Sequence, residues 1–169
     1  MKGISLENAN RTSSLDEEDI VYKTILVPLD GSKRAEAILP HVEELAQRYE
    51  AEVVFVRVLE PIPYVSGPEG TPVTLREQEL ELRRKDAEQY LKARRGEFME
   101  KGIEAKGVVF QGPVVEAITD AAEREGADLI AIASHGRSGL AQCFYGSVAA
   151  GVLNRADRPL LVIRSLSEK

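Results

Sequence analysis

Residues 24–32 read TILVPLDGS, and this stretch decides the fold class of the chain. Residues 24–29 form a short apolar run with β-branched members, which is typical of a strand buried inside a sheet. The segment Asp30-Gly31-Ser32 ends the run, and Ser32 is a residue type that caps the N-termini of helices. The stretch therefore predicts a buried strand that leads directly into a helix.

The helix expected after this stretch carries one apolar stripe, made of Ala35, Ile38, Leu39, Val42, Leu45 and Ala46. Pro40 lies within the pattern and removes one backbone donor, so we expect a kink at that point. Residues 53–59 predict a second strand. Residues 60–73 hold prolines and glycines outside any regular pattern and predict a loop.

The rest of the chain continues to alternate between helices and strands. A long charged helix is expected over residues 75–101, ended by Gly102. Its basic clusters, Arg83-Arg84-Lys85 and Arg94-Arg95, are interpreted as a solvated face rather than a phosphate site, because glutamates alternate with them. The remaining elements are strands at 105–111, 129–133 and 159–164, a helix that opens at Gly112 with Pro113 as its first residue, and a helix at 147–155.

This order of elements predicts an α/β fold: a single-domain, Rossmann-like open sheet of five mostly parallel strands with helices on both faces. The domain is expected to span residues 21–165. Residues 1–20 show no apolar periodicity and predict a disordered N-terminal tail, and residues 166–169 predict a short C-terminal tail. In such sheets, ligands bind beyond the carboxyl ends of the strands, at the topological switch point.

The composition narrows the classes of protein that fit. The 169 residues suit one domain, and no apolar run approaches the ~20 residues that cross a bilayer. The formal net charge of −6 weakly disfavours binding to nucleic acid or to an anionic membrane, and the absence of tryptophan disfavours stacking on single-stranded nucleic acid. The first residues lack the apolar core of a signal peptide and the single Cys143 cannot form an internal disulfide, so we expect a cytoplasmic protein.

The loop after the fourth strand carries residues of chemical interest. Gly136 lets the backbone approach a ligand with no Cβ in the way. Gly146 and Ser147 place free amides and a hydroxyl at a helix N-terminus, where anions bind. Neither a Walker A loop nor a G-x-G-x-x-G fingerprint is present. Spacing alone leaves two alternatives open: a phosphate site, or an ordinary turn followed by a helix cap.

Taken together, these segments resemble the universal stress protein family. Its ATP-binding members carry a Gly-x2-Gly-x9-Gly-Ser/Thr pattern after the fourth strand, and this chain has Ala133-x2-Gly136-x9-Gly146-Ser147. The stretches VPLDGS at 27–32 and DRPLLVI at 157–163 match the family's first and last strands. Ala133 is the one departure, and it adds only a methyl group at a strand end that does not need a positive φ.

The resemblance implies an adenine-nucleotide site with ATP or AMP as the ligand. Residues at the ends of the first and second strands would recognise the adenine, and residues after the fourth strand would flank the ribose and the phosphates. Any Mg²⁺ would be held mainly by phosphate oxygens and waters. The implied binding positions, from adenine to phosphates, are Pro28, Leu29, Asp30, Val58, Gly112, Ile132, Ala133, Gly136, Arg137, Gly146, Ser147 and Val148.

The resemblance also implies a function, that of a stress-response regulatory protein that signals through its nucleotide state and its dimer or partner contacts. We expect no catalytic residues, no protein metal site and at most slow ATP hydrolysis, because no metal-binding carboxylate and positioned nucleophile accompany the loop. His135 is interpreted as structural or ligand-lining. The alternative function is an interaction module of the same fold that binds no nucleotide. A homodimer is expected through the apolar last strand, at Leu160, Leu161, Val162 and Ile163.

Overall fold

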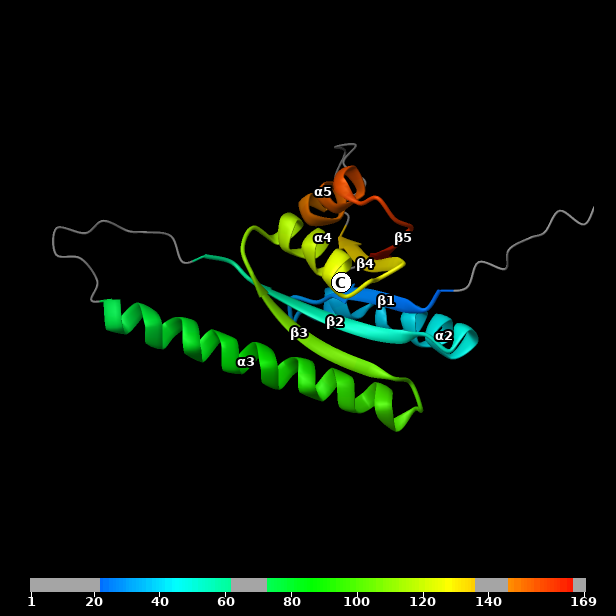
Figure 1. Ribbon diagram of the computed structural model, residues 1–169, viewed down its shortest axis with the longest axis horizontal. Helices are drawn as coiled ribbons and strands as arrows, with labels where there is room; N and C mark the ends of the chain where they lie inside the picture. The colour runs from blue at the N-terminus through cyan, green and yellow to red at the C-terminus, as the bar shows by residue number, and fades with distance from the viewer. Residues whose placement is uncertain (1–21, 62–72, 136–145, 166–169) are drawn as a thin grey trace, which may run out of the picture.

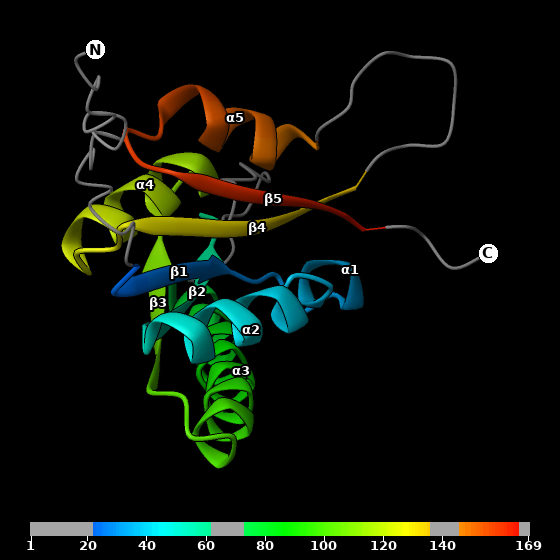
Figure 2. The same ribbon diagram turned by 90° about the vertical axis from the view of Figure 1, so that its right-hand side faces the viewer.

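The computed structural model describes residues 22–61, 73–135 and 146–165. Both expected tails, most of the expected loop at 60–73, and the segment with Gly136, Arg137 and Cys143 lie outside these ranges. Within them the chain forms one sheet flanked by helices (Figures 1 and 2). None of the helices in the described ranges has the length and apolar character needed to cross a membrane.

The sheet has five strands in the order β3-β2-β1-β4-β5, and every neighbouring pair is parallel. The predicted five-stranded open sheet is therefore confirmed, and it is parallel throughout. β1 lies at its centre, and β5 lies at an edge, as expected (Figure 2). The strands are β1 (Thr24–Pro28), β2 (Glu52–Leu59), β3 (Ala105–Gln111), β4 (Leu129–His135) and β5 (Leu160–Ser165).

Helices cover both faces of the sheet, as predicted. One face carries α1 (Lys33–Glu36), α2 (Leu39–Tyr49) and α3 (Val73–Glu100), and the other carries α4 (Val114–Arg124) and α5 (Ser147–Arg155) (Figure 2). Alternate strand residues enter different cores: Ile25 and Val27 pack on the α2 and α3 side, and Leu26 packs on the α4 and α5 side. Burial on both faces explains why the strands read as continuous apolar runs.

The first helical segment differs from the expected single helix with a kink. α1 ends at Glu36, residues 37–38 form a turn, and α2 begins at Leu39. A proline inside a helix clashes with the carbonyl four residues before it, and for Pro40 that residue is Glu36. The helix therefore breaks, and Pro40 lies in the first turn of α2, where an N–H has no intrahelical partner.

The predicted first residues of two helices can be compared with those in the structure. Ser32 caps α1 as expected, since its Oγ accepts a hydrogen bond from the Ala35 amide at 3.2 Å. Pro113 was expected as the first residue of its helix, but it is the N-cap of α4, with φ −60° and ψ 134°. The helix starts one residue later because Pro113 keeps an extended ψ.

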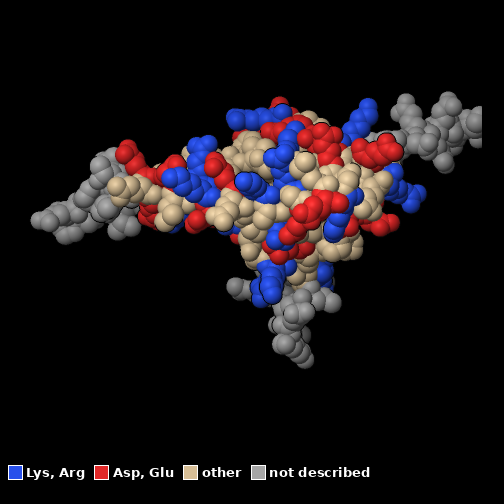
Figure 3. All heavy atoms as spheres, turned by 90° about the horizontal axis from the view of Figure 1, so that it is seen from below, with Lys and Arg blue, Asp and Glu red and all other residues tan. Residues whose placement is uncertain are grey.

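The basic clusters of α3 pair with its own glutamates. Arg83, Arg84 and Lys85 form i,i+4 ion pairs with Glu79, Glu88 and Glu81, and all of these side chains are largely exposed. Figure 3, seen from below the view of Figure 1, shows acidic and basic side chains interleaved on this side. The interpretation of these clusters as a solvated helix face agrees with the pairing.

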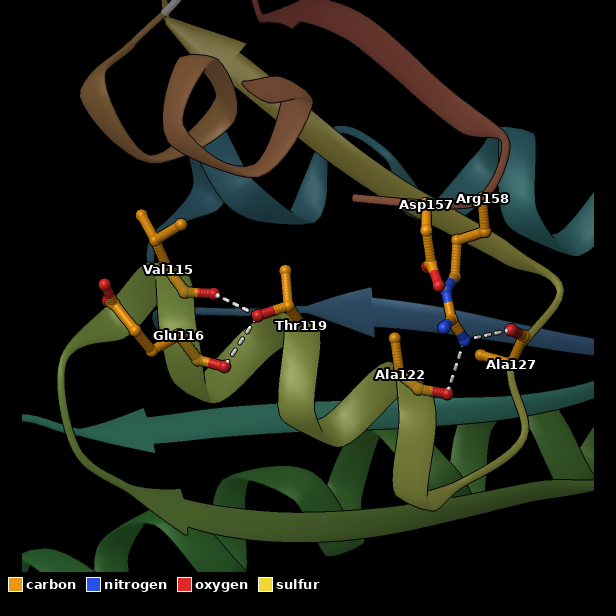
Figure 4. Close-up of polar contacts among 7 residues, drawn as sticks. All are labelled: Val115, Glu116, Thr119, Ala122, Ala127, Asp157 and Arg158. Carbon is orange, nitrogen blue, oxygen red and sulfur yellow. Dashed lines mark hydrogen bonds and ion pairs between the residues drawn. The ribbon is translucent and has the colours of Figure 1, made fainter. Parts of the chain in front are cut away.

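Arg158 lies just before β5 and links that segment to the C-terminal end of α4. Arg158 Nη1 donates to the carbonyls of Ala122 at 2.8 Å and Ala127 at 2.7 Å, while its Nε donates to Asp157 Oδ1 (Figure 4). The two carbonyls lie at the end of α4 and in the turn before β4. The Ala122 carbonyl also accepts the Ala127 amide at 2.9 Å, and a cation at this position is favoured by the negative end of the helix dipole.

We expect Arg158→Ala to lower the free energy of unfolding by about 2 kcal/mol, because two hydrogen bonds to a charged donor are lost. The matched control is Arg155→Ala, which breaks an exposed ion pair with Glu116 and should cost less than about 1 kcal/mol. Urea denaturation of both variants measures the difference. Equal losses would show that Arg158 does not join these ends.

Replacement of two helical glycines by alanine is predicted to change the stability in opposite directions. A Cβ on Gly151 in α5 would lie 2.6 Å from Val115 Cγ2 of α4, whereas a Cβ on Gly96 in α3 would meet nothing within 4 Å. We expect Gly151→Ala to destabilise the protein by about 1 kcal/mol or more through overpacking, and Gly96→Ala to stabilise it by roughly 0.5–1 kcal/mol. Thermal unfolding of the pair tests this, and a shift of the same sign in both would contradict it.

Candidate functional site

The sheet opens between β1 and β4. β1 pairs with β2 over its whole length, but it pairs with β4 only at Ile25 with Leu129 and Leu26 with Ile130. The two strands therefore separate toward their carboxyl ends. The chain adds β2 and β3 on one side of this junction and β5 on the other, so the junction is the topological switch point.

A cleft of about 700 Å³ lies where the strands separate, a volume within the usual range for small-molecule sites. Residues at the ends of β1, β2 and β4 line it, together with the starts of α1, α4 and α5. Two acidic residues, Asp30 and Glu60, lie among its polar groups. Its apolar residues include Leu29, Val56, Val58, Val114, Ile118, Ile132 and Val148.

Many of the predicted binding positions meet in this cleft: Pro28, Leu29, Asp30, Val58, Ile132, Ala133 and Val148. Gly146 and Ser147 precede Val148 at the start of α5, and neither lines the cleft itself. Gly112 does not line it either. Gly136 and Arg137 lie outside the described residues. The geometry brings most of the described positions together, and their roles in binding stay predictions.

The cleft also holds basic residues that were not among the predicted positions, namely Lys33, Arg34 and Arg57. Lys33 and Arg34 directly follow Ser32 at the start of α1. Arg57 interrupts the apolar run of β2 immediately before Val58. A charged residue in an otherwise buried strand is the sequence signal that identifies Arg57, because such residues seldom lie in a strand interior without a partner.

Asp30 stabilises the turn in which it lies. The Ser32 amide donates to Asp30 Oδ1 at 2.8 Å, and Gly31 between them has a φ of +81°. Partial burial raises the pKa of Asp30, but hydrogen bonds from Ser32 and the charge of Arg57 outweigh it and bring the pKa below its usual value. Asp30 is therefore ionised at neutral pH and can accept a hydrogen bond from a ligand amino group.

The start of α5 lies next to the cleft. Its N-cap, Gly146, has φ −60° and ψ 157°, and no side chain caps the helix among the residues that the structure describes. The first amides of a helix have no intrahelical acceptor, and the helix dipole favours an anion there. Val148 connects this end of α5 to the cleft. An anion at this helix end would therefore lie next to the cleft.

One polar side chain in the described part of the cleft is already hydrogen-bonded within the sheet. Ser134 lines the cleft, but its Oγ donates to the Ile163 carbonyl at 3.2 Å and so joins β4 to β5. Across the described ranges, no group of three or more His, Cys, Asp or Glu residues could hold a metal ion. The side chains at hand are therefore apolar walls and charged groups for a ligand to contact.

Known proteins resemble this chain over most of its length. Residues 21–164 match the model of the universal stress protein family. The chain is 30% identical over 156 residues to universal stress protein MJ0577 of Methanocaldococcus jannaschii, which covers 86% of this chain and 96% of that protein. A solved structure of MJ0577 has a TM-score of 0.70 at 29% identity and covers 88% of this chain and 100% of that one.

Two other solved structures share the fold. A universal stress protein in complex with cAMP has a TM-score of 0.64 at 19% identity, over 86% of this chain and 99% of that one. The universal stress protein from Archaeoglobus fulgidus in complex with dAMP has a TM-score of 0.55 at 22% identity, over 85% and 99%. At these identities the likeness concerns the fold.

Asp30→Asn keeps an acceptor for the Ser32 amide and removes only the charge. Because the pKa of Asp30 is lowered in the folded state, its carboxylate stabilises the fold above the unfolded-state pKa, and that contribution is lost as the pH falls through the folded-state pKa. We expect the variant to be less stable than wild type near neutral pH, and the difference to shrink below about pH 4. Urea denaturation across this pH range measures the difference, and one that widens toward acid would contradict the assignment.

Proposed function

The chain belongs to the universal stress protein family, and from this membership we propose that it binds an adenine nucleotide in the cleft between β1 and β4. In this proposal it is a stress-response regulatory protein whose nucleotide state changes its contacts with a second copy or a partner. ATP and AMP are the proposed ligands.

One observation carries the proposal: a single cleft at the switch point has apolar walls and an ionised carboxylate, and the first turn of α5 reaches it through Val148. The adenine would pack on Leu29 and Val58, with Asp30 accepting a hydrogen bond from its amino group. The ribose would lie beside Ile132 and Ala133. The phosphates would accept hydrogen bonds at the start of α5.

Proteins of the same fold support the ligand class. One is solved in complex with cAMP and another in complex with dAMP. Both ligands join an adenine to a single phosphate group, so a fold of this kind can hold the two moieties that the cleft is proposed to receive.

The remaining predicted positions keep their proposed roles. Gly112 has a φ of +140° at the end of β3, a conformation that favours glycine, and it would allow close approach. Gly136 and Arg137 would complete the phosphate site. Any Mg²⁺ would be held by phosphate oxygens and waters, because the described residues contain no metal-binding cluster.

We propose binding with at most slow hydrolysis, in a cytoplasmic protein. A homodimer would form through β5, an edge strand whose Leu160, Leu161, Val162 and Ile163 are only partly buried. The alternative is an interaction module of the same fold that binds no nucleotide, and it would give the apolar walls of the cleft no ligand to contact.

Ser147 offers a matched pair of variants. Ser147→Pro removes both an amide and a hydroxyl, yet proline suits the first position of a helix, and Gly146 already has the extended geometry that a following proline requires. Ser147→Ala removes the hydroxyl alone. We expect Ser147→Pro to weaken ATP binding at least about tenfold and Ser147→Ala to weaken it less.

Isothermal calorimetry with ATP, AMP and cAMP, with and without Mg²⁺, measures these affinities. Thermal unfolding of both variants serves as the control for folding, and neither should be markedly destabilised. Absence of binding by the wild-type protein to all three nucleotides would refute the proposed function. Equal affinities for the two variants would place the phosphates away from α5.

A further inference from the structure

Arg57 lies between two cavities at the end of β2. One is the cleft between β1 and β4, and the other, of about 430 Å³, lies between the end of β2 and α3. Arg57, Val58 and Glu60 line both cavities. The end of β2 therefore separates the two cavities, and Arg57 is the basic residue among the three that line both.

The guanidinium of Arg57 packs against the turn that carries Asp30. A Cβ placed on Gly31 would lie 2.8 Å from Arg57 Nη1, and the φ of Gly31 is +81°. Any other side chain at this position would be strained by the positive φ, and the guanidinium would have to shift to make room for it. The turn is thus fixed on one side by the hydrogen bond from Ser32 to Asp30, and on the other by Arg57.

α3 fixes the opposite side of the guanidinium through Tyr90. Arg57 Cζ lies 5.8 Å from the centroid of the Tyr90 ring, within the range of a cation–π contact. The Tyr90 hydroxyl donates to Glu36 Oε1 at 2.8 Å, and Arg94 lies 5.7 Å from the same ring centroid. Burial, followed by the hydrogen bond to Glu36, raises the pKa of Tyr90, so the hydroxyl keeps its proton. Tyr90 lines the second cavity and does not line the cleft.

One nitrogen of Arg57 is unfavourable for stability. Its Nη1 is buried and has no hydrogen-bond partner in the part of the chain that the structure describes. A buried donor without an acceptor destabilises the folded state. Methionine would fill much of the same space without that penalty. A residue that breaks the packing rules in this way commonly serves a site.

We propose that Arg57 is a positioning residue for the adenine end of the cleft: packed against Tyr90, it holds the turn of residues 30–32 in its binding geometry and links the cleft to α3. Its effect on affinity rests on the proposed function. Its effect on the turn does not, and can be measured in the protein without ligand.

The charged groups around Asp30 are consistent with Arg57 as a positioning residue. Lys33 and Arg34 line the same cleft from α1, Arg57 lines it from β2, and Glu60 follows on the same wall. Burial raises the pKa of Asp30, while the hydrogen bonds from Ser32 and the charge of Arg57 lower it. Removal of Arg57 should therefore shift the titration of the Asp30 carboxyl toward higher pH.

Arg57→Met keeps most of the side-chain volume and removes the charge. We expect this variant to lose about tenfold or more in affinity for ATP and AMP, with thermal stability equal to or above that of wild type. In the ligand-free protein, the amide resonance of Gly31 should shift and the Asp30 carboxyl should titrate at higher pH.

Tyr90 supplies a second test, because it does not line the cleft. Tyr90→Leu should shift the Gly31 amide and weaken nucleotide binding in the same direction as Arg57→Met, while Tyr90→Phe keeps the ring and should retain most of the affinity. Arg48→Met is the matched control: Arg48 lies 5.9 Å from the ring centroid of Tyr49 on α2, outside the cleft. It should leave both the affinity and the Gly31 amide unchanged.

Calorimetry and amide spectra together separate the two proposals. If Arg57→Met and Tyr90→Leu shift the Gly31 amide but wild type binds no nucleotide, the proposed function fails and the positioning of the turn stands. If wild type binds and both variants bind equally well with an unchanged Gly31 amide, the inference is overturned and the proposed function stands. A large loss of stability in Arg57→Met would also overturn it, because Arg57 would then be a structural residue.

Discussion

The pairing between β1 and β4 ends after Leu26 and Ile130, and the rest of the site depends on that early end. β1 does not leave the sheet there, because the Leu29 amide still donates to the Val56 carbonyl of β2 at 2.8 Å. The opening is therefore confined to the β4 side. Residues from both core faces reach this opening, which is how one cleft combines Leu29 from the α2 and α3 core with Ile118 from the α4 and α5 core.

The apolar runs were sufficient to predict the strands, because a parallel strand covered on both faces has little choice of residue. The residues at which the helices start were predicted less well. Ser32 caps through its own hydroxyl and could be predicted from its type, but Pro40 acts on the carbonyl of Glu36, and whether that clash bends or breaks a helix depends on the packing around it. Local sequence specifies the element and leaves its exact start to tertiary contacts.

The residues of the cleft also differ in how well the sequence predicts them. Asp30 follows β1, Val58 lies near the end of β2 and Ile132 lies within β4, so the topology alone places them near one another. The topology also places Arg57, which directly precedes Val58, but its proposed role depends on contacts with Gly31 and Tyr90, which lie on other elements. Contacts between residues distant in the chain carry no periodic pattern. The residues beyond the described ranges, Gly136 and Arg137 among them, remain predictions.

The close approach of α5 to α4 has a consequence for how such a sequence can vary. Gly151 leaves room for Val115, and each of them limits the volume available to the other. A larger residue at 151 is compatible with this helix spacing only if the residue at 115 becomes smaller. The two positions should therefore change together during evolution, even though neither lines the cleft. Because α5 also presents Val148 to the cleft, this paired constraint preserves the position of the helix end proposed to receive phosphate.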